Sequence, residues 1–396
     1  MRAAMEGVDR ADSQLFESGP PLGLQRRMGL VKLGRPEVVR RCALVILIGW
    51  VPLALLTMMR DGALVGDDVQ AFAKDIAVHA RFLIAAPLLI VAEIVSASRL
   101  GAVALHFRDA GLVTERDQPH FAAALVSTRA LLDSNKVEIG VIALAYLTVG
   151  SIVFSVHLDQ LPRWHLSSGG VAATFSLAGY WHVLVSLPLL LVLLFGWIWR
   201  LCLWTRFLWL MSRLDLRLVA VHPDHVAGLQ FLGYSVQGYS VVALALASIV
   251  AGQVMTKIIH HDVLTLAQQA GFGAMLLFIV ALFTAPLLVF CGPLLRTRRR
   301  GVFEYGAGAS KFGIEFERKW LNRNKQGNEE VMQAPDFSTA TDLHQLVSNV
   351  YAMRLVPVDL RSMIVLVGTV LVPFVPVLLI STPIDVILAG MKNLLL

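Results

Sequence analysis

Apolar residues gather in seven long blocks along this 396-residue chain, separated by shorter polar stretches. Each block is close to the about 20 residues that a helix needs to cross the hydrocarbon core of a bilayer. The pattern therefore predicts seven transmembrane helices. They are expected at residues 42–59, 82–104, 138–157, 179–203, 236–258, 267–291 and 362–388.

The composition leads to the same class of protein. Hydrophobic residues make up 56% of the chain and charged residues only 16%, whereas soluble domains carry about 25% charged residues. Motifs of soluble enzymes are absent: there is no phosphate-binding glycine-rich loop, no G-x-S-x-G, no H-E-x-x-H and no paired C-x-x-C. We predict an all-α, polytopic helical membrane protein that needs no cofactor.

The distribution of lysine and arginine predicts the orientation. With the N-terminus placed in the cytoplasm, only six of the 34 lysine and arginine residues fall on the outer side. Cytoplasmic loops carry the excess of these residues in membrane proteins. We therefore expect the N-terminus inside and the C-terminus outside, in a bacterial inner membrane. The basic residues would face anionic lipids of the inner leaflet, so the net charge of +6 needs no nucleic acid as a partner.

The same pattern divides the chain into four parts. We expect a basic cytoplasmic arm at 1–37 and six spans within 38–292, with a cytoplasmic helix near 118–133. Residues 293–361 are expected to form a cytoplasmic segment of amphipathic helices, and residues 362–396 the last span and the C-terminus. In the third part the cluster RTRRR is interpreted as the end of the sixth span, and Thr339 is expected to cap a helix.

Four segments resemble a family of bacterial multi-pass membrane proteins. They are HPDHVAGLQFLG at 222–233, YGAGASKFGIEFERKWL at 305–321, FSTATDL at 337–343 and MRLVPVDLRSMIVLV at 353–367. The resemblance implies the class of protein and its compartment. It implies no activity and assigns no functional residue.

Glu93 is the most informative single residue, because it lies near the middle of the second apolar block. An isolated carboxylate in hydrocarbon is very costly, so Glu93 is expected to be protonated, paired with another helix, or open to water. Tyr146, Thr148 and Ser248 are expected at a similar depth and can form hydrogen bonds. A proton- or cation-handling site on a transport path and an interhelical hydrogen bond that fixes packing are both left open.

His222, Asp224 and His225 form the second candidate. Two histidines beside an aspartate suggest a metal site or acid–base chemistry, but fewer than three ligands are in hand, so the metal interpretation is weak. Asp224 is instead expected to cap a helix and to bind backbone N–H groups two or three residues on. The start of that helix, with Arg213, Arg217 and His225 nearby, is predicted to bind an anion such as a lipid phosphate.

Other polar and small residues suggest less specific roles. The cysteines Cys42, Cys202 and Cys291 are expected to be packing residues. A row of small residues at 240, 243, 247 and 251 predicts a close helix contact, within one subunit or between subunits, and we expect the protein to form a homo-oligomer. A metal site between outer loops is not favoured; its candidate ligands are His157, His165, His182, His260, His261, Asp159 and Asp262.

The function predicted from these features is a channel, transporter or membrane sensor for a small ion or solute, with Glu93 on or near the path. The alternative is a signalling scaffold that binds a partner through residues 296–361. A membrane-embedded metal-dependent enzyme is the least favoured of the three.

Overall fold

The computed structural model describes residues 19–21, 23, 38–61, 66–155, 161–167, 174–260, 265–318 and 335–381. Within these ranges the chain is helical and contains no β-strand, only two isolated β-bridges. Seven helical stretches are long and apolar enough to cross a membrane, which confirms the predicted number and places of the spans. They are Val38–Arg60, Ile76–Asp109, Asn135–Ser155, Leu177–Ser212, Ser240–Ile259, Leu266–Phe316 and Leu360–Ser381.

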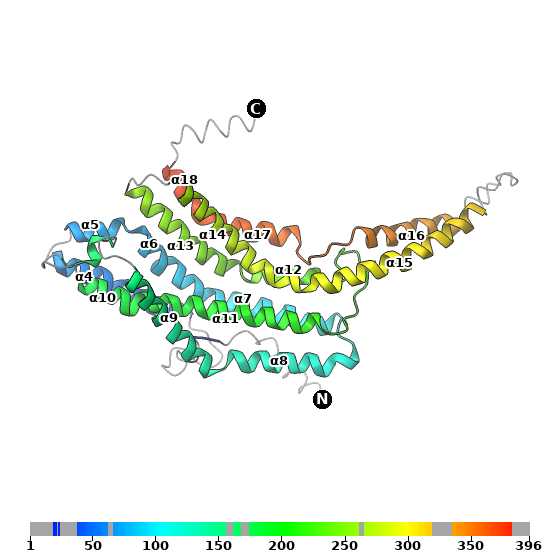
Figure 1. Cartoon of the computed structure of the whole chain (residues 1–396), viewed down its shortest axis with the longest axis horizontal. Helices are drawn as coiled ribbons and strands as arrows, with labels where there is room; N and C mark the ends of the chain where they lie inside the picture. Colours follow the sequence, from blue (N-terminus) through cyan, green and yellow to red (C-terminus); the bar gives the residue numbers. More distant parts are fainter. Residues whose placement is uncertain are drawn as a thin grey trace, which may run out of the picture.

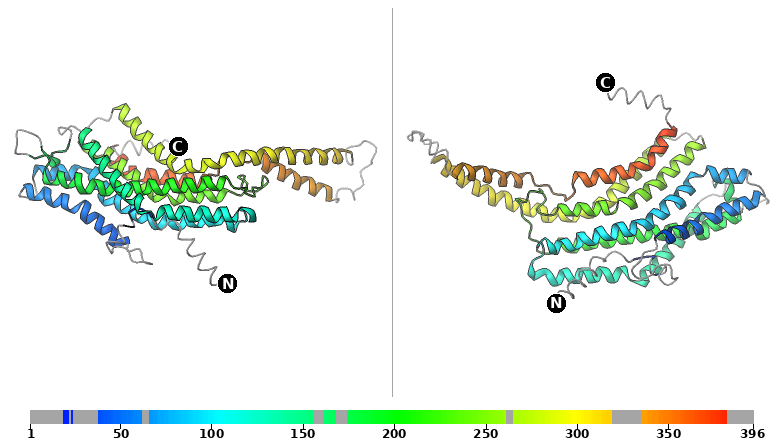
Figure 2. Two further views of the ribbon diagram at one scale, coloured as in Figure 1. Left: turned by 60° about the horizontal axis from the view of Figure 1, so that its bottom comes forward. Right: turned by 180° about the vertical axis from the view of Figure 1, so that it is seen from behind.

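The long helices run side by side along the long axis of the molecule (Figures 1 and 2). Helices α7 and α11 lie in the middle, α13, α14 and α17 cover one side, and α8 and α9 cover the other. The bounds of the first elements are α3 Val38–Gly49, α4 Val51–Asp61, α5 Asp67–Lys74, α6 Ile76–His79, η1 Ala80–Ala85, α7 Ala86–Asp109, η2 Glu115–Asp117, α8 Gln118–Leu132 and α9 Asn135–Ser155. The others are η4 Arg163–His165, α10 Leu177–Trp181, η5 His182–Ser186, α11 Leu187–Ser212, η6 Gln230–Leu232, α12 Gly233–Gly238, α13 Ser240–Ile259, α14 Leu266–Thr284, η7 Ala285–Phe290, α15 Cys291–Phe316, α16 Pro335–Tyr351, α17 Leu360–Leu371, η10 Val372–Phe374 and α18 Val375–Ser381.

Helix α13 is the central contact of the bundle. It packs on α6, η1, α7, α14 and α17. Most of its row of small residues is buried inside the subunit, with Ala243 and Ala247 fully covered and Ser240 half-buried. A Cβ at Gly252 would lie 2.5 Å from the Cβ of Ala80, so only glycine permits this approach. The row therefore serves packing within one chain and gives no support to a homo-oligomer.

The helix that contains the sixth span continues far beyond residue 291, where the apolar block ends. Helices α14, η7 and α15 form one stretch of 51 residues, which at about 1.5 Å per residue exceeds the thickness of a bilayer. RTRRR lies inside α15, because arginine is a good helix former and the end of the apolar stretch does not end the helix. Helix α16 packs against α15, and the pair projects from the bundle (Figure 1).

One detail of the cytoplasmic segments differs from the sequence prediction, and one agrees with it. Helix α16 begins at Pro335, so Thr339 lies inside the helix and not at its cap. The expected helix near 118–133 is present as α8.

Part of the N-terminal arm packs into the bundle. Residues 19–21 are buried, and the guanidinium of Arg200 donates to the carbonyl of Gly19 at 3.4 Å. A Cβ at Gly196 would lie 2.4 Å from the carbonyl oxygen of Pro20, so α11 needs glycine at this contact. The described part of the arm is thus attached to α11. Most of the predicted 1–37 arm lies outside the described residues.

Candidate functional site: a polar pocket between two π-helical turns

Two neighbouring spans each contain a π-helical turn at the same end of the bundle. The turns are η1, which contains Arg81, and η5, which begins at His182. Each is followed by a proline in the first turn of the next helix, Pro87 or Pro188. Proline cannot donate a backbone hydrogen bond to the preceding turn, so a wider turn fits there. π-Turns occur frequently at functional sites, and here both face one pocket.

The pocket has a volume of about 350 Å³. Its walls come from α6 and η1, α9, the loop at 161–165, η5 and α13, so four different spans and one loop contribute to it. The polar side chains that line it are Asp75, Arg81, His165, His182, Gln253 and Thr256.

Two buried histidines form a hydrogen-bonded pair at this pocket. His165 Nε2 and His182 Nδ1 are 3.0 Å apart, and both rings lie against Trp164. The outer nitrogens, His165 Nδ1 and His182 Nε2, are buried and have no partner among the described residues. When both rings are neutral, the N–H of one ring donates a hydrogen bond to the bare nitrogen of the other. Either ring can be the donor. The pair therefore offers one free N–H donor and one free acceptor.

Asp75 and Arg81 both line the pocket, but they do not form an ion pair. The Asp75 carboxylate accepts from the Trp164 indole at 3.2 Å and from the backbone N–H of Val78 at 3.3 Å. The half-buried Arg81 guanidinium makes no hydrogen bond or ion pair with any described residue. A partly buried cation is usually paired. Arg81 is thus a cation on which the charge of Asp75 acts, but which is in direct contact with no described carboxylate.

Burial and, to a smaller extent, the charge of Arg81 together lower the pKa of His165 to about 3. Protonation of this ring would place a second cation beside Arg81. At neutral pH the pair is therefore neutral and acts through hydrogen bonds.

This pKa predicts a stability change in acid. The folded protein keeps His165 neutral down to about pH 3, while the unfolded chain takes up a proton near 6.5. Stability is therefore complete above pH 6.5 and falls as the pH drops below it, by about 1–2 kcal/mol between pH 7 and pH 5. Unfolding in detergent measured at both pH values should show this loss in the wild type and less of it in His165→Asn.

His120 provides the control for this measurement, because its side chain is 72% exposed. The variant His120→Asn should keep the full pH dependence of the wild type. An equal flattening in both variants would contradict a specific role of the buried pair.

Glu93 lies in a buried ion-pair network at another level of the bundle. Its carboxylate accepts from the guanidinium of Arg41 on α3 and from Arg200 Nη2 on α11, the latter at 3.2 Å. Of the three outcomes left open by the sequence, pairing with another helix is the one observed. Arg200 also lies over the ring of Trp197, at 5.0 Å from its centroid, and its Nε and Nη1 have no partner among the described residues.

The hydroxyl residues expected near Glu93 bind elsewhere. Tyr146 donates to the carbonyl of Leu184 at 3.2 Å. Thr148 and Ser248 donate to carbonyls one turn back in their own helices. The structure therefore does not bring Tyr146, Thr148 or Ser248 to Glu93.

Asp224 organises a loop, and no long helix begins beside it. Its carboxylate accepts from the backbone N–H groups of Val226, Gly228 and Gln230 at 2.9–3.2 Å and contacts His222 Nδ1 at 2.8 Å. Burial raises the pKa of Asp224, but these hydrogen bonds outweigh that effect and lower it overall. Gly228 has φ +92° and marks the tight turn. Asp224 therefore binds backbone N–H groups as expected, but these groups belong to a loop and not to the start of a helix.

The anion site predicted at this loop is only partly assembled. Arg217 and His222 line a cavity of about 340 Å³ beside Asp224. Arg213 instead stacks on Trp209 at 5.0 Å. The carbonyl of His225 accepts from the backbone of Arg354, and its Nδ1 is buried without a partner in the described chain. The loop and the MRLVP segment at 353–357 are thus in direct contact.

The metal-site hypotheses receive no support from the described residues. No group of three or more histidine, cysteine, aspartate or glutamate residues that could hold a metal ion is found there. The three cysteines form no disulfide, and they belong to no group of possible metal ligands among the described residues. His157, His261, Asp159 and Asp262 lie outside the described residues.

Sequence reasoning missed Arg81 and Gln253, and it placed His165 and His182 only in a loose group. The available signal was Arg81 at the edge of an apolar block, six residues before Pro87. That spacing is common in membrane proteins, so it does not identify a pocket. Comparison with protein-family models, with curated proteins and with solved structures found no match to this chain.

Proposed function

We propose that this membrane protein transports a small solute with an anionic group, and that the pocket between η1, η5 and α13 is its binding site. The observation that carries the proposal is the Arg81 guanidinium, which lines the pocket and forms no direct ion pair with a described carboxylate, although the charge of Asp75 acts on it. Gln253 and the free N–H of the histidine pair add neutral donors beside it. Charge-assisted bonds from arginine are the strong ones in anion recognition.

The set of elements that line the pocket favours a transport site over a purely structural one. The lining residues come from several spans that meet at π-turns, and interrupted helices often surround the binding sites of transporters. The lysine and arginine bias and the family resemblance support a bacterial inner membrane with the N-terminus inside. In that orientation the pocket opens toward the outer side.

The variant Arg81→Gln tests the binding site. We expect it to weaken anion binding about 10- to 100-fold, because one charge-assisted hydrogen bond contributes about 1.5–3 kcal/mol. Purified full-length protein in detergent is titrated with acetate, inorganic phosphate and glycine, and binding is measured by the shift in thermal unfolding. Uptake of the bound probe into proteoliposomes then separates transport from sensing, since a sensor binds without flux.

Arg163 offers a matched control at the same end of the molecule. It is exposed and does not line the pocket. Arg163→Gln should bind as the wild type does. If no probe shifts the wild type, or if Arg81→Gln responds as strongly as the wild type, anion binding at this pocket is refuted.

A second candidate function is the signalling scaffold. The α15–α16 pair projects from the bundle and exposes large apolar side chains, among them Phe303, Ile314 and Leu346. Such residues on a polar segment favour contact with another surface. Binding that survives Arg81→Gln but is lost when Ile314 and Leu346 become serine would favour the scaffold over the transporter.

A further inference from the structure

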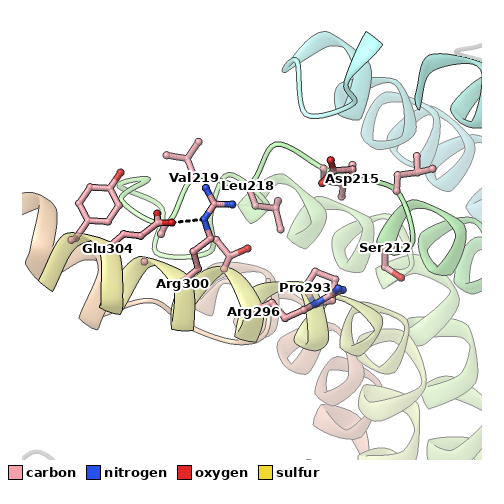
Figure 3. Close-up of a pocket in the computed structure, with 14 residues that line it drawn as sticks. Ser212, Asp215, Leu218, Val219, Pro293, Arg296, Arg300 and Glu304 are labelled. Carbon is pink, nitrogen blue, oxygen red and sulfur yellow. Dashed lines mark hydrogen bonds and ion pairs between the residues drawn. The ribbon is translucent and has the colours of Figure 1, made fainter. Parts of the chain in front are cut away.

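A second cleft lies at the opposite end of the bundle from the pocket. It has a volume of about 440 Å³ and is enclosed by the chain at 212–220 on one side and by the first half of α15 on the other (Figure 3). The polar side chains in its lining are Ser212, Asp215, Arg296, Thr297, Arg300, Glu304 and Tyr305.

The wall formed by α15 carries two arginines and a glutamate in an ordered arrangement. Arg296, Arg300 and Glu304 follow one another at intervals of four residues, so they lie along one side of α15. Arg300 Nε is 2.9 Å from Glu304 Oε1, but the two side chains are 78% and 58% exposed, and such surface pairs are weak. Arg296 is in no ion pair in the described chain. Both arginines can therefore turn to a ligand.

The facing wall supplies a carboxylate. The backbone N–H of Asp215 donates to Asp117 at 2.9 Å, which fixes the chain at this point. The Asp215 carboxylate itself lines the cleft and makes no ion pair with a described residue. With Glu304 it balances the two arginines, so the charges of the lining sum to zero.

The cleft lies at the level where the apolar spans end. Helix α11 ends at Ser212, and the stretch at 266–295 contains no charged residue before Arg296. The boundary between an apolar span and its first charges marks the headgroup region of a bilayer. A lipid headgroup is therefore the molecule most concentrated at the mouth of this cleft.

We propose that the cleft binds the headgroup of a zwitterionic phospholipid with a primary ammonium group, such as phosphatidylethanolamine. The phosphate oxygens accept hydrogen bonds from Arg296 and Arg300, and the ammonium donates to Asp215 and Glu304. An anionic headgroup would satisfy the arginines but leave the two carboxylates facing a negative charge. A trimethylated headgroup has no N–H to donate. This inference is independent of the proposed transport function.

Lipid retention tests the proposal. Purified full-length protein is titrated with phosphatidylethanolamine, phosphatidylglycerol and phosphatidylcholine of identical acyl chains, and bound lipid is counted by native mass spectrometry. We expect phosphatidylethanolamine to bind most tightly. Arg296→Gln should weaken its binding about ten-fold, the factor expected for one charge-assisted hydrogen bond. Asp215→Asn should abolish the preference over phosphatidylcholine.

Arg299→Gln is the matched control, because Arg299 is exposed on the same helix but does not line the cleft. It should retain lipid as the wild type does. Equal losses in Arg296→Gln and Arg299→Gln, or tighter binding of phosphatidylglycerol, overturn the proposal. Displacement of the lipid by soluble phosphoethanolamine at equal concentration would assign the same chemistry to a free ligand and overturn the lipid as its source.

Discussion

Replacing Glu93 with glutamine is expected to lower the free energy of unfolding by about 3–5 kcal/mol, the cost of breaking a buried ion pair. Glu93 is 6% exposed and is bound by two guanidinium groups, and Arg200 is 3% exposed. The glutamine side chain is neutral, so it would leave the guanidinium groups of Arg41 and Arg200 inside the bundle without the carboxylate. Unfolding in mixed micelles titrated with SDS, followed by tryptophan fluorescence, measures the loss.

A double-mutant cycle separates the pair from the individual residues. Arg200→Met alone leaves the carboxylate with fewer donors, whereas Glu93→Gln with Arg200→Met removes both members. We expect the double variant to lose less stability than the sum of the single variants. Glu304→Gln serves as the control, because its carboxylate is 58% exposed and its loss should change stability by about 0.5 kcal/mol or less.

The same variant bears on the transport path. The structure holds Glu93 between two arginines, and the proposed binding site lies elsewhere, at Arg81. If Glu93→Gln unfolds readily yet transports at wild-type rate below its unfolding temperature, the network joins α3, α7 and α11 and carries no solute. Full stability together with lost transport would contradict this interpretation and restore Glu93 to the path.

Replacing Asp224 with alanine is the second large expected effect, a loss of about 2–4 kcal/mol. Three backbone N–H groups lose their acceptor, and an unsatisfied buried donor costs about 1–3 kcal/mol. The Asp224 side chain is 8% exposed, so water replaces these bonds poorly. Asp224→Asn keeps one carbonyl oxygen and should lose less. Thermal unfolding in detergent compares the two variants with the wild type.

Asp109→Ala is a suitable control because that carboxylate is 57% exposed and contacts only its neighbour Arg108 in the described chain. The folded pKa of Asp224 is lowered. Its contribution is therefore complete above the unfolded value of 3.8 and is lost as the pH falls through the lower folded value. If Asp224→Ala is as stable as the wild type, this result contradicts the structural role and again favours a metal or acid–base site at His222 and His225.

Individual residues show how far a sequence can identify a site. Glu93 stands out in the sequence because a charge inside an apolar block is costly wherever its partner lies. Its partners do not stand out, because Arg41 and Arg200 are 52 and 107 positions away and lie at the ends of their own apolar blocks. An arginine at such a place usually extends to the membrane surface. Here both reach inward to the carboxylate.

The loop around Asp224 also shows that a sequence predicts local contacts but not distant ones. An aspartate before a turn binds the following N–H groups, and this tendency is local enough to be read from the sequence. The contact of Arg354 with the carbonyl of Asp224, at 3.4 Å, joins segments 130 residues apart. Nothing in the sequence of either segment specifies the other.

The sequence by itself determined the class of the protein and the positions of its seven spans, because crossing a bilayer depends on the length and polarity of each segment alone. The end of the sixth helix was not determined in this way, since charged residues end a membrane span but do not end a helix. The pocket, the Glu93 network and the second cleft were decided only by the tertiary structure. Each assembles side chains from several helices, and helix packing depends on the shapes of all contacting surfaces together.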